Sequence, residues 1–509
     1  MEMREKIDHV VLLMLENRSL DNVLGWLYPG DKPDNKPKRF IGLDQTQHYH
    51  GLQEVTGITK GTVGATGTGV PAQPMRVPGF DPNEQYEHTN QQLFGSQAHP
   101  TTQNPQYGTP AAMAGFAYDF TTSSWWNPGK ENPDQHHQIV EAYSPEQLPV
   151  LNGLAKHYAV SDAWFASVPT ETTPNRAFSI CGTSLGRVDD GEADWDFYPQ
   201  YNARTLWEAL PDDTSWAIYY HEIWNKDQCY TQWTFPFLNN AKGPGDDILQ
   251  ISYKTGFYEK ANAGKLPNFT FLEPAWGYGL GKDDGSGFYC PEGGVHLYPG
   301  EQGNDYHPPT WMGPGEAFVN KVYTALTGNA EAWKKTLLII TFDEHGGTYD
   351  HVDPGWNKNI EPGDNLYGPD GFRFDRYGVR VPILLISPWI AEGTVFRSSD
   401  PDPNLKYDHT SLIATLLKWR GVDPKTAHLR NRVANAPTFE GVLADQPRAD
   451  VPQFTVPAGY ADQGAACMHG HIKAIPPGVA RAILAKGGTR EAVEARTKQW
   501  LAGHPGGAQ

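Results

Sequence analysis

Val10-Val11-Leu12-Leu13-Met14-Leu15 is a continuous apolar run that stops abruptly at Glu16-Asn17-Arg18-Ser19. A second run, Thr336-Leu337-Leu338-Ile339-Ile340-Thr341-Phe342, stops in the same way at Asp343-Glu344-His345-Gly346-Gly347. Apolar residues follow one another in both runs and do not alternate with polar ones, which is typical of strands covered on both faces. The two runs therefore predict central strands of a largely parallel sheet.

Further segments fit around these strands. The pattern predicts a third buried strand over residues 379–386, and helices over residues 145–156, 315–326 and 410–419. Strands and helices that alternate along a chain favour an α/β fold, in which helices flank the sheet.

Two long irregular segments interrupt this pattern. Residues from about 29 to 115 are rich in Gly, Pro, Gln and Thr, and residues from about 189 to 303 are rich in Trp and Tyr. Structureless loops of such length are uncommon inside a compact domain, so we interpret both segments as insertions laid over the sheet. We predict one main domain over residues 1–430 and a C-terminal extension over 431–509, with a terminal helix at 477–501.

The charge of the chain limits its partners. The 509 residues include 41 Lys+Arg and 59 Asp+Glu, a net charge of −18 at neutral pH. This charge would repel nucleic acid or an anionic lipid surface, but it is compatible with a zwitterionic surface or with a small anion held at a local metal site.

Targeting and redox signals are sparse. No run of about 18 apolar residues occurs, so we expect no transmembrane segment, and the first apolar run is too short for a signal peptide. We expect a cytoplasmic protein, or one exported without a cleaved signal peptide. The four cysteines lack metal-type spacing, and both free thiols and up to two disulfides remain open; they are Cys181, Cys229, Cys290 and Cys467.

The polar ends of the two strands point to a cation. Ligands of open parallel sheets bind beyond the carboxyl ends of the strands, so Glu16-Asn17 and Asp343-Glu344 are expected to meet there. Alone, each acidic pair is as consistent with a helix cap or a solvated loop. Together, four oxygen-bearing side chains repel one another unless a cation lies among them.

A helix start provides a second feature. In Val168-Pro169-Thr170-Glu171-Thr172-Thr173-Pro174-Asn175-Arg176, Pro174 suits the first position of a helix, with Thr172 or Thr173 at its edge. Gly182 would end this helix. A hydroxyl, free backbone N–H groups and the positive end of a helix dipole together form an anion site, although an ordinary capped helix start fits the same residues.

These segments resemble a known family. The chain is similar to the phosphoesterase family of bacterial phospholipases C and acid phosphatases, which belongs to the alkaline phosphatase superfamily. The similarity extends from about residue 7 to 422 and rests on five blocks in the same order: residues 7–19, 172–176, 341–352, 380–389 and 408–411. The resemblance implies a central mixed sheet flanked by helices.

The resemblance also implies roles for individual residues. It implies a metal site of Glu16, Asn17, Thr172, Asp343 and Glu344, with the Thr172 hydroxyl as nucleophile and with Asn17, Asn175 and His88 near the phosphate. Oxygen ligands favour Ca²⁺, Mg²⁺ or Mn²⁺, with Zn²⁺ as an alternative. His307 and His409 are implied proton donors, and Asp305, His307 and His409 a possible second metal site. His345 and His351 lie beside the metal pair in sequence, and His351 is as well explained by a contact that fastens its loop.

The predicted activity is hydrolysis of a phosphoric ester. Thr172 stands where the acid phosphatase branch has Ser, which favours a phospholipase C type diesterase on phosphatidylcholine-like esters, through a phosphothreonine intermediate. Alternatives are a phosphomonoesterase, a sulfatase or phosphonate hydrolase, and a non-catalytic binding protein that holds a structural Ca²⁺. A roof of aromatic residues would suit a choline group; the candidates are Trp125, Trp126, Tyr219, Tyr220, Trp224 and Trp276. Oligomeric state cannot be read from the sequence.

Overall fold

A computed structural model gives the fold of the protein. It describes residues 2–28, 40–43, 65–66, 77–78, 81–122, 138–190, 201–221, 229–239, 247–251, 255–275, 288–289, 296–297, 303–308, 312–356 and 367–457. The predicted helix at 477–501, Cys290, Cys467 and the tryptophans 125, 126, 224 and 276 lie outside these residues.

An eight-stranded mixed sheet forms the centre of the molecule, in the order β13-β4-β12-β11-β1-β8-β6-β7. All neighbours pair in parallel except at β12, which runs antiparallel to both β11 and β4. The fold class predicted from the sequence, a mixed sheet flanked by helices, is therefore confirmed. The strands are β1 (His9–Leu15), β4 (Ala159–Ser161), β6 (Trp216–Tyr220), β7 (Asp247–Gln250), β8 (Phe269–Leu272), β11 (Thr336–Phe342), β12 (Ile383–Ile386) and β13 (Thr394–Phe396).

The two apolar runs form adjacent central strands. β1 and β11 pair in parallel over their whole length, from His9 opposite Thr336 to Leu15 opposite Phe342. Every residue of β11 is buried, as are all residues of β1 after His9, because helices cover both faces. The third predicted strand is shorter than expected: β12 begins only after Pro382, which has no N–H to donate to a ladder.

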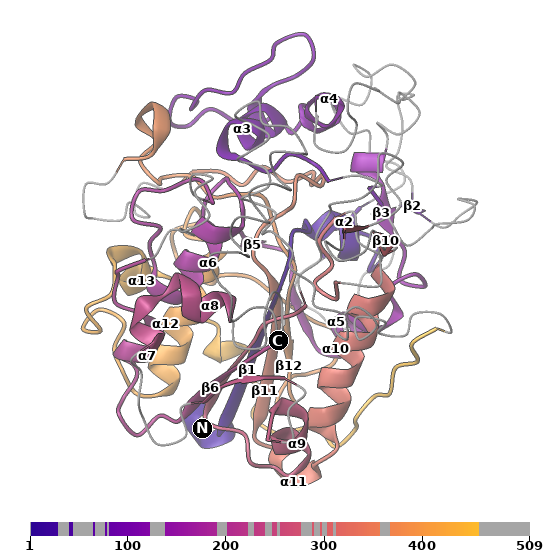
Figure 1. Ribbon diagram of the computed structural model, residues 1–509, viewed down its shortest axis with the longest axis vertical. Helices are drawn as coiled ribbons and strands as arrows, with labels where there is room; N and C mark the ends of the chain where they lie inside the picture. The colour runs from indigo at the N-terminus through magenta and orange to yellow at the C-terminus, as the bar shows by residue number, and fades with distance from the viewer. Residues whose placement is uncertain are drawn as a thin grey trace.

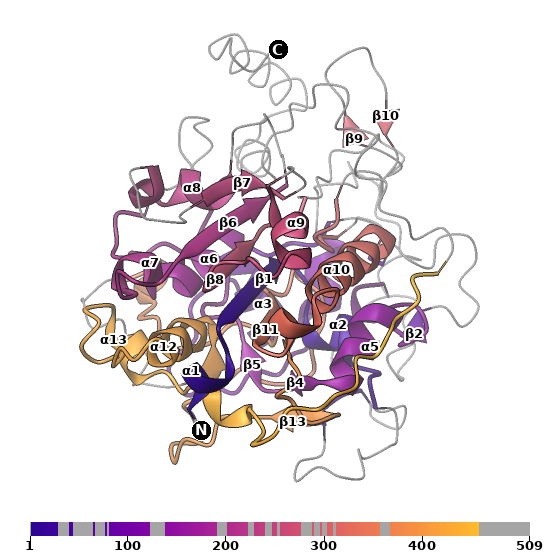
Figure 2. The same cartoon turned by 90° about the horizontal axis from the view of Figure 1, so that it is seen from below.

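Helices pack on both faces of the sheet (Figure 2). α12 and α13 lie on one side, and α5 and α10 on the other. The helices are α1 (Met3–Lys6), α2 (Leu20–Leu24), α3 (Tyr86–Phe94), α4 (Phe116–Thr121), α5 (Pro149–His157), α6 (Thr172–Cys181), α7 (Leu206–Ala209), α8 (Tyr230–Thr234), α9 (Phe257–Asn262), α10 (Met312–Thr327), α11 (Ala330–Trp333), α12 (His409–Trp419) and α13 (Asn431–Asn435), with 3₁₀ turns η2 (Pro236–Asn239), η4 (Pro369–Gly371) and η5 (Glu440–Val442).

The three predicted helices exist with shifted starts. α5 begins at Pro149, in place of residue 145, because Pro suits the first turn. α10 begins three residues early, at Met312. α12 begins at His409, where the Asp408 carboxylate accepts a hydrogen bond from Thr410 N.

The segment 189–303 is not simply an insertion. It supplies β6, β7 and β8, three strands of the main sheet. Tyr219 and Tyr220, expected in a roof over the site, are buried residues of β6. The aromatic content that suggested a roof instead reflects the β-propensity of Trp, Tyr and Phe in buried strands.

The described parts of the first insertion and of the C-terminal extension pack onto the main body. α3 and α4 lie beyond the carboxyl ends of β1 and β11 (Figure 1). Val433, Phe439 and Leu443 belong to the main core cluster, and Phe454 packs against it. Three small two-stranded sheets complete the fold: β2 (Ala65–Thr66) with β3 (Ala142–Tyr143), β5 (Trp164–Phe165) with β14 (Tyr407–Asp408), and β9 (Phe288–Tyr289) with β10 (His296–Leu297).

Candidate active site

The ends of β1 and β11 bring the two acidic pairs together, as their parallel register requires. Asn17 N donates to Asp343 Oδ1 at 3.0 Å, and Glu344 N donates to the same oxygen at 2.7 Å. Close approach of the two segments demands glycine at position 346, because a Cβ there would lie 2.2 Å from Asn17 O, and φ is +59°. Residues more than 300 apart in sequence thus share one hydrogen-bonded turn.

Thr172 faces this turn from the first position of α6. Its Oγ1 lies 3.2 Å from Glu16 Oε2 and 3.3 Å from Asn17 Oδ1. Thr172 is 7% exposed, whereas Glu16 is 1% exposed and Asn17 is fully buried. Thr172 is therefore the most exposed of these three residues.

The start of α6 differs from the prediction. Glu171 is the N-cap residue, so Pro174 occupies the third position of the helix and not the first. Thr173 N donates to Asp190 Oδ1 at 2.7 Å, and Asp190 N donates to Glu171 Oε1 at 2.7 Å. At least one N–H of the expected anion site is therefore already bound by a carboxylate. Gly182 ends the helix with φ +73°, as predicted.

Asn175, predicted to bind phosphate, faces its own loop instead. Its Nδ2 donates to Thr170 O at 2.8 Å and to Val168 O and Glu171 O, both at 3.2 Å, while its Oδ1 accepts from Val168 N at 3.0 Å. This side chain fixes the loop that presents Thr172, and its hydrogen-bonding groups are directed away from a phosphate.

Arg176 is a member of the centre that sequence reasoning missed. It is 1% exposed; its Nε donates to Glu16 Oε1 at 2.9 Å and lies 3.3 Å from Asp343 Oδ2. Burial opposes its charge, but the carboxylates of Glu16 and Asp343 raise the pKa of Arg176. Its position four residues after Thr172, one helical turn away on the same face, was the available signal.

The electrostatics of the centre call for added positive charge. Burial raises the pKa of Glu16 well above its ordinary value, with Arg176 lowering it and Asp343 raising it further. Burial, and then the charge of Asp343, raise the pKa of Glu344 in the same way. With Glu16, Asp343 and Glu344 all ionised, three carboxylates and the Arg176 guanidinium would carry a formal charge of −2, since −3 + 1 = −2, which one divalent cation would balance.

The donor set fits such a cation. Glu344 Oε2 accepts from Gly346 N at 2.7 Å, whereas Glu344 Oε1 is buried and has no hydrogen-bond partner among the described residues. A buried carboxylate oxygen without a partner is costly unless an ion binds it. With Glu16, Asn17 and Thr172 it forms a set of oxygens, the ligands that hard cations prefer.

Two other groups bring three ligand atoms within 4.8 Å of one another in the described part of the chain. One is Asp21, Asp350 and His351, and the other is Asp81, Glu84 and His307. Glu16, Asp343 and Glu344 do not form a third group by this distance.

The residues predicted for a second metal do not assemble as expected. Only His307 belongs to one of these groups; its backbone N donates to Asp305 Oδ1 at 3.1 Å. His409 Nε2 lies 2.5 Å from Asp343 O. A carbonyl oxygen only accepts, so His409 Nε2–H donates to it, and burial lowers the pKa of His409. Asp81 and Glu84, from the first insertion, are the partners that sequence reasoning missed.

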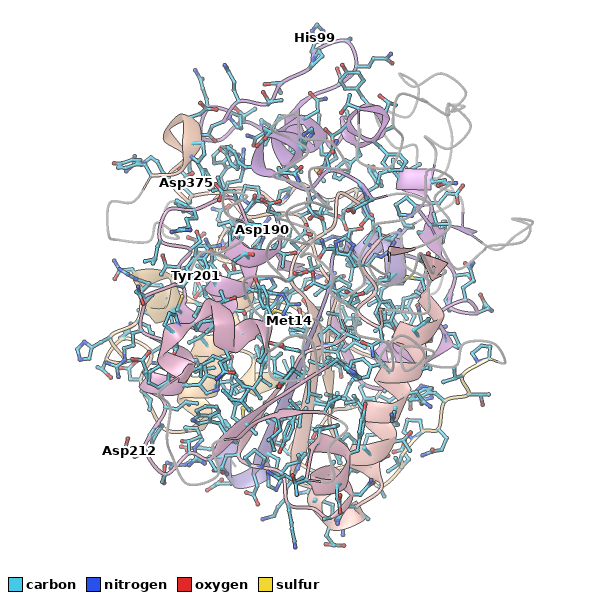
Figure 3. All side chains as sticks on the ribbon, in the orientation of Figure 1. Met14, His99, Asp190, Tyr201, Asp212 and Asp375 are labelled. Atoms are coloured by element: carbon cyan, nitrogen blue, oxygen red, sulfur yellow. The ribbon has the colours of Figure 1, made fainter. Side chains whose placement is uncertain are left out.

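His88 and His351 each lie beside a buried aspartate. His88 Nδ1 lies 2.7 Å from Asp119 Oδ1, which is an ion pair on the α3–α4 unit if His88 is protonated; its contact with phosphate stays a prediction. His351 Nδ1 lies 2.6 Å from Asp21 Oδ2 and fastens its loop, although through Asp21 and not Asp350. Figure 3 shows His99 at the periphery of the molecule and Met14 of β1 in its interior. Cys181 and Cys229 are free thiols.

Comparison with known proteins shows the family of the chain. The Phosphoesterase family matches residues 7–423. The chain belongs to this family. It is 32% identical over 469 residues to non-specific phospholipase C1 of Arabidopsis thaliana, covering 88% of this chain and 73% of the relative.

Two further comparisons extend the picture. The chain is 24% identical to hemolytic phospholipase C of Pseudomonas aeruginosa, covering 82% of this chain and 53% of that protein. A solved structure from the alkaline phosphatase superfamily, from Vibrio parahaemolyticus, matches 55% of this chain and 62% of its own with a TM-score of 0.27 and 17% identity. This family member is thus a hydrolase of phosphoric esters, as predicted. No helix in the described ranges has the length and apolar character needed to cross a bilayer.

Proposed function

We propose that the protein is a cation-dependent phosphodiesterase of the phospholipase C type, and that Thr172 is its nucleophile. The observation that carries this proposal is the position of the Thr172 hydroxyl. It lies between Glu16 Oε2 and Asn17 Oδ1, in a centre with a formal charge of −2, and it is more exposed than its neighbours.

Glu16, Asn17, Thr172, Asp343 and Glu344 would hold the cation, with Ca²⁺, Mg²⁺ or Mn²⁺ favoured and Zn²⁺ as an alternative. When bound, a divalent cation lowers the pKa of a hydroxyl that it contacts and offsets charge on phosphoryl oxygens. Arg176 holds the carboxylates of Glu16 and Asp343 side by side.

The proposed reaction has two steps. Thr172 Oγ1 releases its proton to solvent and bonds to phosphorus, while the bond between phosphorus and the leaving alcohol breaks and that alcohol takes a proton from a histidine. A water molecule then bonds to phosphorus and gives a proton to the same histidine, while the Thr172–phosphorus bond breaks and Thr172 Oγ1 regains a proton from solvent.

His307 and His409 are the two candidates for the proton donor. His307 Nδ1 lies 2.5 Å from Pro308 O, and the ring lies in a group with the carboxylates of Asp81 and Glu84. Nε2 of His409 is bound to Asp343 O, whereas its Nδ1 is buried without a hydrogen-bond partner among the described residues.

The substrate is proposed from the relatives. Two matched proteins are named phospholipases C, and a net charge of −18 suits a zwitterionic lipid such as phosphatidylcholine better than an anionic bilayer. The alternative is a phosphomonoesterase with the same centre.

Two variants and two substrates test the proposal. Thr172→Val should lose hydrolysis of p-nitrophenyl phosphorylcholine by about a thousandfold or more, while Thr172→Ser, which keeps the hydroxyl, should retain much of it. A strong preference for p-nitrophenyl phosphate would favour the monoesterase. Undiminished turnover by Thr172→Val would remove Thr172 as nucleophile, and binding of ligand without hydrolysis in the wild type would favour a non-catalytic protein.

A further inference from the structure

Two acidic residues hold the start of α6, next to the proposed nucleophile. Glu171 is the N-cap residue of this helix, and Thr172 is its first residue. Thr173 N donates to Asp190 Oδ1 at 2.7 Å, and Asp190 N donates to Glu171 Oε1 at 2.7 Å. Asp190 is 7% exposed. Its side chain and its backbone are both tied to the helix start, so its carboxylate has a fixed position beside the residue that follows Thr172.

The Asp190 carboxylate occupies a place that would otherwise suit an anion. The N–H groups in the first turn of a helix have no partner within the helix, and together with the helix dipole they favour a negative group. An oxygen of Asp190 accepts from one of these groups, Thr173 N. The helix start therefore has one donor fewer for a phosphoryl oxygen, and it carries a negative charge of the protein's own.

The charge of Asp190 also acts on the carboxylates after β11. Burial, and then Asp343, raise the pKa of Glu344, and Asp190 adds to this shift. Burial raises the pKa of Asp190 itself to about 6, hydrogen bonds from Thr173 lower it, and the charges of Asp189 and Asp343 raise it further. At pH 8 Asp190 is therefore a carboxylate, and its charge interacts with those of Asp343 and Glu344.

Two classes of phosphoric ester bring different charges to this place. A phosphomonoester has a second pKa of about 6, so it carries two negative charges at pH 8. A phosphodiester carries one, because an alkyl group takes the place of the second ionisable proton. A like charge in the binding site lowers the affinity for the ligand that carries more of that charge.

We propose that Asp190 is a specificity-determining residue, and that its carboxylate makes the centre favour phosphodiesters over phosphomonoesters. This proposal rests on the proposed function, because it requires the phosphorus to lie beside Thr172. It extends that function from the chemistry of the nucleophile to the class of ester that the nucleophile receives.

Neighbouring aspartates provide matched variants. Asp190→Asn removes the charge and keeps an oxygen that can accept from Thr173 N. Asp190→Ser removes the same charge with a smaller side chain, and Asp190→Glu keeps the charge. Asp189 is exposed, so Asp189→Asn makes the same change of charge one residue away, at a position where water and salt screen it.

Steady-state kinetics of the full chain with Mn²⁺ at pH 8 test the proposal. The substrates are p-nitrophenyl phosphate and methyl p-nitrophenyl phosphate, which differ by one methyl group, and the measured quantity is the ratio of kcat/KM for the monoester to that for the diester. This ratio should rise by about tenfold or more in Asp190→Asn and in Asp190→Ser. Asp189→Asn should stay within about twofold of the wild type. Asp190→Glu should lie closer to the wild type than Asp190→Asn does.

Equal ratios in Asp190→Asn and Asp189→Asn would overturn the role of Asp190, as would an Asp190→Glu ratio equal to that of Asp190→Asn. Urea unfolding of each variant establishes that folded proteins are compared. Failure of the proposed function gives other results: the wild type prefers the monoester, or Thr172→Val turns over either ester undiminished. Those results concern the wild type and Thr172, whereas the role of Asp190 is judged by the change in the ratio between variants.

Discussion

Two acidic clusters lie beyond the carboxyl ends of the same two strands, and they differ in how their charge is balanced. The first cluster, here called the clamp, consists of Asp21, Asp350, His351 and Arg380. Arg380 donates to Asp350 Oδ1 and to Asp21 Oδ1, both at 2.9 Å, and His351 pairs with Asp21. With a charged His351 the clamp sums to zero. The nucleophile centre of Glu16, Asp343, Glu344 and Arg176 sums to −2.

The pKa directions express this difference. Burial alone would raise the pKa of Asp21, but His351 and Arg380 bring it below its ordinary value, whereas burial keeps the pKa of Asp350 raised although Arg380 lowers it. Burial raises the pKa of Glu16 and of Glu344, and Arg176 offsets this only in part for Glu16. We therefore expect loss of a charged partner in the clamp to reduce stability, and the centre around Thr172 to bind a cation, as proposed above.

Removing the arginine of the clamp should have the largest effect on stability. Arg380→Met leaves two buried carboxylates without their partner, so we expect a loss of about 3–5 kcal/mol in the free energy of unfolding. Urea unfolding measures it. Lys418→Met, which breaks the partly exposed pair with Glu440, is the control and should cost about 1 kcal/mol or less. The contrast between the clusters fails if Arg380→Met weakens Mn²⁺ binding without destabilising the fold.

Changing a carboxylate of the nucleophile centre should lower the activity without lowering the stability. Asp343→Asn removes charge that a cation and Arg176 share, so kcat/KM should fall by about 10²- to 10³-fold. Stability without cation should be unchanged or higher, because one buried charge of a like-charged group is gone. Steady-state kinetics and urea unfolding in EDTA measure the two effects. A fully active Asp343→Asn would contradict the role given to this cluster.

Removal of the cation should lower the free energy of unfolding of the wild type. A ligand at 100 times its Kd stabilises the native state by about 2.7 kcal/mol, and EDTA should abolish this. The free energy of unfolding is compared with and without EDTA. Asp343→Asn should show a much smaller change, whereas a clamp variant, His351→Gln, should show the wild-type change. An EDTA effect that survives in Asp343→Asn would place the ion elsewhere.

The pH dependence of the clamp should give the smallest effect. Burial opposes the charge of His351, but Asp21 raises its pKa above the ordinary 6.5. A raised pKa contributes stability that is complete below pH 6.5 and is lost as pH rises through the folded-state pKa. Between about pH 6 and pH 9 the wild type should therefore lose about 1–2 kcal/mol more than His351→Gln, the size of one charge-assisted hydrogen bond. Urea unfolding at both pH values measures this difference. An equal change in the free energy of unfolding in the wild type and in His351→Gln would refute the assignment.

The central strands β1 and β11 could be predicted from the sequence because each is a continuous run of apolar residues. Thr336–Phe342 has the predicted bounds, and the polar residues after each strand meet because parallel strands end at one edge. β6 to β8 were missed because Trp216–Tyr220 and Phe269–Leu272 sit in an aromatic segment whose short runs do not distinguish strand from loop.

The finer parts of the site depend on tertiary contacts. Glu84 reaches Asn17 Nδ2 at 2.7 Å across 67 residues, and no periodicity in the sequence signals that contact. Asn175 carries the right chemistry for a phosphate, yet the backbone of its own loop uses it. Arg176 follows Asn175 in the sequence, but its hydrogen bond to Glu16 can be recognised only when the position of the strand ends is known.

Anomalous diffraction from crystals of the wild type soaked in Mn²⁺ tests the central claim most directly. The account predicts a manganese peak bonded to oxygens of Glu16, Asn17, Asp343 and Glu344 and adjacent to Thr172 Oγ1, with no peak at Asp21, Asp350 and His351. A peak at the clamp alone, or an empty nucleophile centre at saturating Mn²⁺, would contradict it.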